Sequence, residues 1–243
     1  MRSVVKLCGT VTLGYMCGRY SIAVEGEKLQ KYSAARLTFP YVPRYNAAPS
    51  QELPVILNVS PNGILPVRWG IKRPWMRTLR RDGLINVRTE TLKEKQTFRD
   101  DLENRRYLVL VDGFYEWKEV SRGRKVPFRF CRKDGALFAF AGLWEVNRDE
   151  KGRDFKTFSI VTTAAEPPVA AIHARMPVIL SAGQESAWLS RDLALPALWD
   201  LMEHPDARAL RAYEVSRAVN NARNDSPELI LPVGERASEE VLV

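Results

Sequence analysis

The sequence predicts an α+β protein, a single domain with a strand-rich, mostly antiparallel, barrel-like centre and peripheral helices. Segments rich in β-branched and aromatic residues recur along the chain, separated by turn dipeptides such as Asp-Gly. Segments with helical periodicity are fewer. The length of 243 residues, 45% of them hydrophobic, fits one large or two small globular domains. We find no internal repeat.

Strands are expected wherever apolar and aromatic residues alternate or cluster. In one such segment Phe128 and Phe130 alternate with polar neighbours, and Asp134-Gly135 supplies a hairpin turn. The expected strands are 107–117, broken at Asp112-Gly113, the hairpin 127–146, the strand 155–164 and the short segment 177–180.

Helices are expected where apolar residues recur at helical spacing among good helix formers. The expected helices are 26–37, 91–106, 184–190 and 196–203, with another beginning between 206 and 211. The first third of the chain is rich in proline, which predicts long ordered loops of the kind that often carry function. These prolines are at 40, 43, 49, 54, 61, 66 and 74.

Composition excludes several classes of protein. No run of about 18 apolar residues is present, and the first residues lack the hydrophobic region of a signal peptide. We therefore expect a cytoplasmic, nucleoid-associated protein without a membrane partner. The cysteines, Cys8, Cys17 and Cys131, are odd in number and form no C-x-x-C pair, which argues against disulfides and zinc. Each is either a small buried hydrophobe or a reactive thiol.

The net charge is +8 and the isoelectric point is near 9.5. A basic surface attracts nucleic acid phosphates and releases counterions on binding. Charge that only maintains solubility, an acidic membrane or an acidic protein would also fit this composition.

Two motifs contain candidate acid–base groups. In GFYEWK (113–118), Glu116 lies between two aromatic residues, and a desolvated carboxyl has the raised pKa that suits proton transfer. Its alternative is a strand-end glutamate that faces water. In IHARMPVIL (172–180), His173 precedes Arg175, a pairing that fits an anion such as phosphate. The alternative is a structural histidine, and His204 is expected at a surface helix end with no role.

Two further motifs fit contacts with nucleic acid. In INVRTET (85–91), Asn86 and Arg88 lie on one face of an extended strand, and arginine can bind phosphate with two hydrogen bonds. In WGIKRPW (69–75), Trp69 and Trp75 flank Lys72 and Arg73, so that aromatic rings could stack on bases while the cations hold the backbone. The alternatives are a polar strand rim and two core tryptophans.

With these motifs the chain resembles the SRAP family (SOS response-associated peptidase), the abasic-site processing proteins. The resemblance covers roughly residues 16 to 233. It rests on MCGRY (16–20), YNAAPSQ (45–51), VRWGI (67–71), INVRTET, Phe98-Arg99, LVDGFYEWK (110–118), FAGLWE (140–145), FSIVTTAA (158–165), IHARMPVIL and VSRAVNNARND (215–225).

The resemblance implies a covalent chemistry. Cys17 would be the first residue of the mature protein, and its α-amine would attack the aldehyde of an abasic site in single-stranded DNA. An α-amine has a pKa near 7.7–8.0, so a useful fraction is neutral. The thiol would then close a thiazolidine ring that shields the lesion. Only an N-terminal cysteine has both groups free.

The resemblance also implies roles for the other motif residues. Asn86 would hold Cys17 or the sugar, while Glu116 and His173 would transfer protons in an order left open. Phosphate clamps would be Arg19, Arg88 and Arg175, with Thr162 as a hydroxyl partner and Trp69 and Trp75 stacking at the damaged strand. No metal or cofactor is implied, and a monomer is expected.

Fifteen residues precede Met16 in this chain. We therefore expect residues 1–15 to be a leader or a misassigned start, residues 16–235 the SRAP domain and residues 236–243 a tail. Translation could start at Met16, with the methionine then removed, or a leader could be removed by self-cleavage. The first is favoured because Met16 directly precedes Cys17.

Three functions are compatible with these features. The first is a DNA-repair protein that crosslinks to abasic sites and could also have autoproteolytic and lyase activity. The others are a non-catalytic binder of single-stranded nucleic acid and a thiol peptidase that uses Cys17 and His173. Only the first predicts an adduct that survives denaturation.

Overall fold

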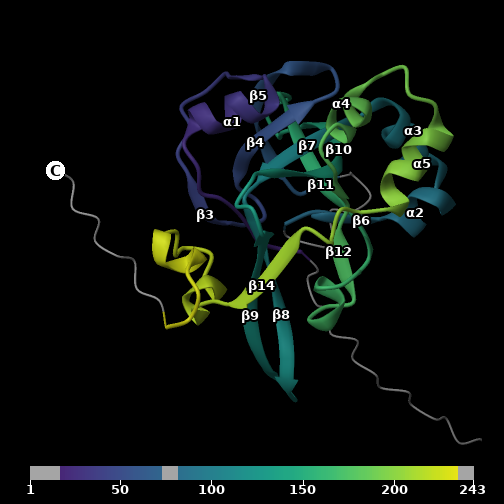
Figure 1. Cartoon of the computed structure of the whole chain (residues 1–243). Coiled ribbons are helices and arrows are strands. Elements are labelled where there is room, and N and C mark those ends of the chain that lie inside the picture. Colours follow the sequence, from purple (N-terminus) through teal and green to yellow (C-terminus); the bar gives the residue numbers. More distant parts are fainter. Residues whose placement is uncertain (1–16, 73–81, 235–243) are drawn as a thin grey trace, which may run out of the picture.

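A five-stranded barrel forms the centre of the computed structural model, which describes residues 17–72 and 82–234 (Figure 1). Neighbouring strands pair antiparallel in the order β11-β10-β7-β4-β5. A parallel pairing of β5 with β11, with Arg68 opposite Thr157, closes the ring. The barrel strands are β4 (Glu52–Leu57), β5 (Ser60–Trp69), β7 (Arg106–Val111), β10 (Phe138–Arg148) and β11 (Asp154–Ala164). The predicted strand-rich, barrel-like α+β centre is confirmed.

A second sheet packs beside the barrel, in the order β14-β9-β8-β1-β3. Its strands are β1 (Tyr20–Ile22), β3 (Arg44–Ala47), β8 (Gly113–Ser121), β9 (Arg124–Arg132) and β14 (Leu210–Glu214). Four short strands extend the barrel sheet: β2 (Arg36–Leu37), β6 (Asn86–Arg88), β12 (Arg175–Pro177) and β13 (Ile179–Leu180). Figure 1 shows β8 and β9 running below the barrel as a projecting hairpin.

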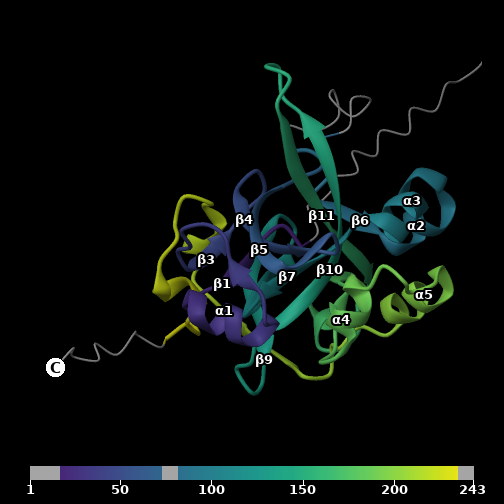
Figure 2. The same ribbon diagram turned by 90° about the horizontal axis from the view of Figure 1, so that it is seen from above.

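Helices lie around the barrel, and α4 and α5 lie along one side of it when the molecule is seen from above (Figure 2). The helices are α1 (Gly26–Ser33), α2 (Thr89–Glu94), α3 (Gln96–Asn104), α4 (Gln184–Leu189) and α5 (Leu195–Glu203), with 3₁₀ turns η2 (Val169–Ala171), η3 (Arg217–Asn220) and η4 (Pro227–Ile230). The helix expected over 91–106 is two helices, because Lys95 has extended backbone angles. None of the described helices is long and apolar enough to cross a membrane.

Aromatic side chains fill the barrel. Trp69 stacks on Phe158, with ring centroids 5.9 Å apart and planes within 5° of parallel. Tyr107 packs on the same Phe158 at 5.0 Å. Gly142 lies opposite Tyr107 on the neighbouring strand, and a Cβ there would come within 2.0 Å of the tyrosine ring. Only glycine lets this ring lie across the strand.

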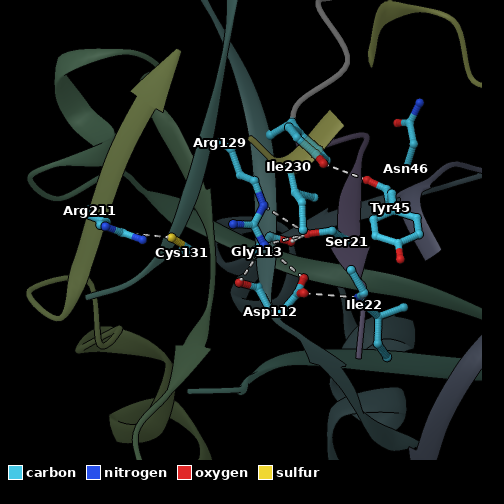
Figure 3. Close-up of polar contacts among 12 residues, drawn as sticks. Ser21, Ile22, Tyr45, Asn46, Asp112, Gly113, Arg129, Cys131, Arg211 and Ile230 are labelled. Atoms are coloured by element: carbon cyan, nitrogen blue, oxygen red, sulfur yellow. Dashed lines mark hydrogen bonds and ion pairs between the residues drawn. The ribbon is translucent and has the colours of Figure 1, made fainter. Parts of the chain in front are cut away.

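A buried ion pair joins the two sheets where the chain leaves β7 and enters β8 (Figure 3). Arg129 Nη2 lies 3.1 Å from Asp112 Oδ1, and both side chains are largely buried. The same guanidinium donates hydrogen bonds to the hydroxyl of Tyr213 and to Ser21 Oγ. Opposite charges with several hydrogen bonds suit this buried position because each offsets the desolvation of the other. The pair fixes the second sheet, and so the start of β8, against the barrel.

Three sequence predictions about the elements are wrong. Segment 127–146 is not a hairpin: β9 pairs with β8 and β14, whereas β10 pairs with β7, β11 and β13, so the turn at Asp134-Gly135 connects two sheets. The segment expected to start a helix at 206–211 instead leads into β14, which pairs with β9. Pro54, Pro61 and Pro66 lie in strands β4 and β5 rather than in loops. Pro54 and Pro66 are opposite each other, where neither needs to donate an N–H.

Candidate active site

Glu116 lies where β8 meets the start of β1, and its side chain is almost fully buried. The backbone nitrogen of Cys17 donates a hydrogen bond of 2.6 Å to Glu116 Oε1. On the other side, Glu116 Oε2 lies 4.0 Å from His173 Nδ1. Three of the candidate residues, Cys17, Glu116 and His173, are far apart in the sequence and are brought together by the fold.

Burial sets the protonation of this group. Desolvation raises the pKa of Glu116 to about 8, although the hydrogen bond from Cys17 acts in the opposite direction. The carboxyl is therefore mostly protonated at pH 7, and it can give a proton and take it back near neutrality. Burial, and then the charge of Glu116, raise the pKa of the Cys17 thiol well above its usual value. The sulfur is a neutral thiol at this pH.

Cys17 itself is buried and has a φ of 40°. Residues other than glycine seldom adopt positive φ, and such conformations persist where the surrounding structure imposes them. The conformation directs the nitrogen of residue 17 toward the Glu116 carboxyl.

A pocket of about 300 Å³ opens beside this group. Its lining residues are Gly18, Arg19, Pro49, Asp82, Glu116, Trp117, Lys125 and His173. This volume is at the lower end of the range for small-molecule sites. The pocket therefore has room for a small polar group next to Glu116, His173 and the backbone that follows Cys17.

The His173 ring is held by its own loop between η2 and β12. Its Nδ1 lies 3.2 Å from the backbone nitrogen of Arg175 and 3.1 Å from the carbonyl oxygen of the same residue. The side chain is one-quarter exposed, so it faces both the buried carboxyl and the open pocket.

Arg175 is engaged by protein groups rather than free for phosphate. Its guanidinium donates to both carboxylate oxygens of Glu90, at 2.6 and 3.0 Å, and to the carbonyl oxygen of Thr162 at 2.7 Å. The Arg175 hydrogen bond is the main reason that the pKa of Glu90 is lowered. A phosphate would have to replace Glu90 to bind the Arg175 guanidinium.

Arg19 ties β1 to the C-terminal segment. It donates to Asn46 Oδ1 at 3.0 Å and to the carbonyl oxygen of Val219 at 2.7 Å, and it also lines the pocket. Arg88 is exposed on β6. Asn86, on the same strand, is half-buried and is not among the described residues that line the pocket.

Two predicted DNA contacts are wrong for physical reasons. Trp69 is fully buried between Tyr20 and Phe158, and its indole N–H donates to the carbonyl oxygen of Ile85, so no base can reach its ring. Thr162 is also fully buried, on β11. Trp75 lies outside the described residues.

Sequence reasoning missed Trp117 and Lys125, which both line the pocket. Trp117 is half-buried, and its indole N–H donates to Asn220 Oδ1 at 2.7 Å. Its position next to Glu116 in GFYEWK was a usable signal. Within residues 17–72 and 82–234, no three His, Cys, Asp or Glu side chains are grouped as metal ligands.

Comparison with known proteins decides the family. The family model for SOS response associated peptidase (SRAP) matches residues 16–222. The chain belongs to the SRAP family. It is 39% identical over 221 residues to the abasic site processing protein YoqW of Bacillus subtilis, covering 88% of this chain and 99% of that protein. It is 30% identical over 227 residues to the abasic site processing protein YedK of Escherichia coli, covering 90% of this chain and 100% of that protein.

Solved structures share the fold seen here. A Bacteroides thetaiotaomicron protein superposes with a TM-score of 0.78 at 22% identity, over 89% of this chain and 99% of that one. A Bordetella bronchiseptica protein superposes with a TM-score of 0.70 at 27% identity, over 82% of this chain and 100% of that one. The barrel and its companion sheet are therefore a shared framework, and the chemistry must be argued from the site.

Proposed function

We propose that this SRAP protein processes abasic sites in single-stranded DNA by forming a thiazolidine crosslink through Cys17, once Cys17 is the first residue. The observation that carries the proposal is the contact between the nitrogen of residue 17 and the buried Glu116 carboxyl. A terminal amine at this position would have an acid–base group at hydrogen-bond distance. The names of the relatives, abasic site processing proteins, support the same substrate.

The proposed reaction balances as a condensation. The neutral α-amine of Cys17 attacks the aldehyde carbon of the ring-opened sugar and forms a carbinolamine. Protonated Glu116 gives its proton to the departing hydroxyl, and the resulting carboxylate then takes the remaining proton from the nitrogen, so that water leaves and a neutral imine remains. The Cys17 sulfur then adds to the imine carbon while its proton passes to the nitrogen. His173, across the carboxyl from Cys17, is placed to exchange protons with the sugar or with Glu116.

The start of the chain controls this chemistry, because a nitrogen within a peptide bond cannot form an imine. We propose that residues 1–15 lie outside the functional domain, which spans residues 16–235 ahead of a short tail, and that Met16 is also removed from the active protein. The positive φ at Cys17 supports loss of the preceding residue, since a terminal amine has no preceding carbonyl to restrict rotation.

A thiol peptidase is the second candidate, favoured by the family description. The electrostatics oppose it. A cysteine nucleophile acts as the thiolate, whereas burial and Glu116 hold Cys17 as the neutral thiol. Removal of a leader by self-cleavage would need only one turnover. The intact mass of the full chain would reveal it even if the protein does not cleave other polypeptides.

The test compares the full chain with a protein expressed from Met16, both checked by intact mass. Each is incubated with a single-stranded oligonucleotide that contains one uracil converted to an abasic site, and the products are separated under denaturing conditions. Material that begins at Cys17 should form a stable adduct, and intact DNA should not. Cys17→Ser should abolish the adduct, whereas Cys131→Ser, which changes the other described cysteine, should leave it.

Two results would contradict the proposal: an adduct of equal yield from protein that keeps residues ahead of Cys17, or an adduct that survives Cys17→Ser. Strand cleavage on the same gel would reveal lyase activity. Salt-sensitive binding without any adduct would support the non-catalytic binder instead.

A further inference from the structure

We infer that the exposed tip of the β8–β9 hairpin binds the phosphate backbone of the DNA strand on one side of the lesion. We call residues 118–125 the basic arm. This inference rests on the proposed function, because it assigns a surface to the flanking strand of that substrate.

The basic arm projects into solvent below the barrel (Figure 1). Every residue from 118 to 125 is exposed, whereas the start of β8, residues 113 to 116, is buried. Ser121 pairs with Arg124, so Arg122 and Gly123 make the turn, and Gly123 has the positive φ of 78° that such a turn requires.

The basic arm continues directly from the active-site pocket. Lys125, at its end on β9, lines the pocket together with Glu116. Seven residues separate Glu116 from the turn at Gly123, which at about 3.3 Å per residue is roughly 20 Å. A stacked DNA strand advances about 3.4 Å per nucleotide, so the arm matches about six nucleotides beyond the lesion.

The charges of the basic arm favour an anionic partner. It carries Lys118, Arg122, Arg124 and Lys125 against the single acid Glu119. Within the described part of the chain, none of these four cations has an ion pair of 4.0 Å or less.

The second projecting hairpin, β10–β11, provides the comparison (Figure 2). There Arg148 pairs with Asp154 at 2.7 Å and Arg153 pairs with Asp149 at 2.8 Å, so its two arginines are neutralised locally. A phosphate can be neutralised by the arginines of the basic arm without displacing a protein carboxylate, whereas at either arginine of β10–β11 it would have to displace one.

A DNA backbone suits this surface better than an acidic protein does. Protein interfaces are usually centred on aromatic or aliphatic anchors, and the basic arm has one exposed large hydrophobic residue, Val120. A row of cations that leads away from a lesion-binding pocket instead follows the course of a flanking strand.

The test uses the full chain and equilibrium binding by fluorescence anisotropy over a range of sodium chloride concentrations. The probe is a lesion-free single-stranded oligonucleotide. Arg122→Gln with Arg124→Gln should lower the salt slope of log K by about 1.4, at about 0.7 per phosphate contact, and weaken binding at 50 mM salt by about tenfold. The matched control, Arg148→Gln with Arg153→Gln, also removes two cations and should change the slope little. Equal slopes for the two double variants would overturn the inference.

A second arm of the test locates the contact. The probes contain a tetrahydrofuran abasic analogue, which has no aldehyde and cannot crosslink, with ten nucleotides on one side and two on the other, or the reverse. The loss of affinity caused by Arg122→Gln with Arg124→Gln should disappear when the contacted side is shortened and persist when the opposite side is shortened. A defect of the same size on both probes would overturn the one-sided contact. Failure of the wild-type protein to form any adduct would refute the proposed function but not this binding result.

Discussion

Replacing Glu116 by glutamine tests the electrostatic reasoning at the centre of the site. Glutamine has nearly the same shape, and its carbonyl oxygen can still accept the hydrogen bond from Cys17. What it removes is the ionisation of a fully buried carboxyl whose pKa is raised to about 8 by desolvation. An ordinary glutamate, as in the unfolded chain, titrates near 4.3.

The sign follows from proton linkage. The folded protein binds the Glu116 proton more tightly than the unfolded chain does, so this residue stabilises the fold fully below pH about 4.3. That contribution is lost as the pH rises through about 8. At 1.36 kcal/mol per pKa unit the whole interval corresponds to at most about 5 kcal/mol. The free energy of unfolding of Glu116→Gln, relative to wild type, should therefore rise with pH and level off above about pH 9.

The assay is urea unfolding of the full chain, followed by tryptophan fluorescence at one-unit steps from pH 5 to pH 9. Glu119→Gln, an exposed position on the same strand, is the matched control and should give a difference from wild type that does not depend on pH. A difference between Glu116→Gln and wild type that is flat across this range, or that falls with pH, would refute the assignment of a buried, protonated carboxyl.

Three further substitutions test the packing that positions the site and one side chain that lines its pocket. Trp69→Ala should cost about 3–5 kcal/mol of unfolding free energy, because the ring is fully buried. Trp117→Ala should cost far less stability and instead weaken binding to abasic DNA by about 1–3 kcal/mol, because Trp117 lines the pocket. Urea unfolding and fluorescence anisotropy, measured on both variants, separate the two effects. Arg129→Ala should destabilise the fold by about 3–5 kcal/mol by leaving Asp112 buried without its cation, and a loss below about 1 kcal/mol in urea unfolding would show that the pair does not hold the sheets together.

The sequence was most informative where one residue pattern allows one structure. The alternating and apolar segments around 107–117 and 155–164 become strands because their residues fit a buried sheet. The turn at Asp134-Gly135 was misleading, because the same dipeptide can join two strands that pair or two strands that diverge into different sheets. Local chemistry cannot distinguish these outcomes, which depend on where the rest of the barrel closes.

The candidate site shows the same limit. Cys17 and Glu116 are 99 residues apart, so their contact arises only from the pairing of β1 with β8, and the residue types and the family resemblance nominated them without any geometry. The error at Trp69 was avoidable. Val67, Trp69 and Ile71 alternate along the chain and are all buried, a period of two that places the ring on the core face.

The strand β8 explains how a dry proton-transfer group and a charged arm can serve one substrate. The first half of β8 is buried against the barrel, and this burial raises the pKa of Glu116. The second half projects into solvent, so the cations of the basic arm stay solvated. A strand pairs its backbone along its whole length, so the same hydrogen-bond ladder fixes both halves relative to each other. Groups about 20 Å apart without shared partners act additively. Loss of Arg122 and Arg124, at the tip of the arm and away from the pocket that Lys125 lines, should therefore weaken DNA binding while leaving the chemistry of bound DNA unchanged, and loss of the Glu116 carboxyl should do the reverse.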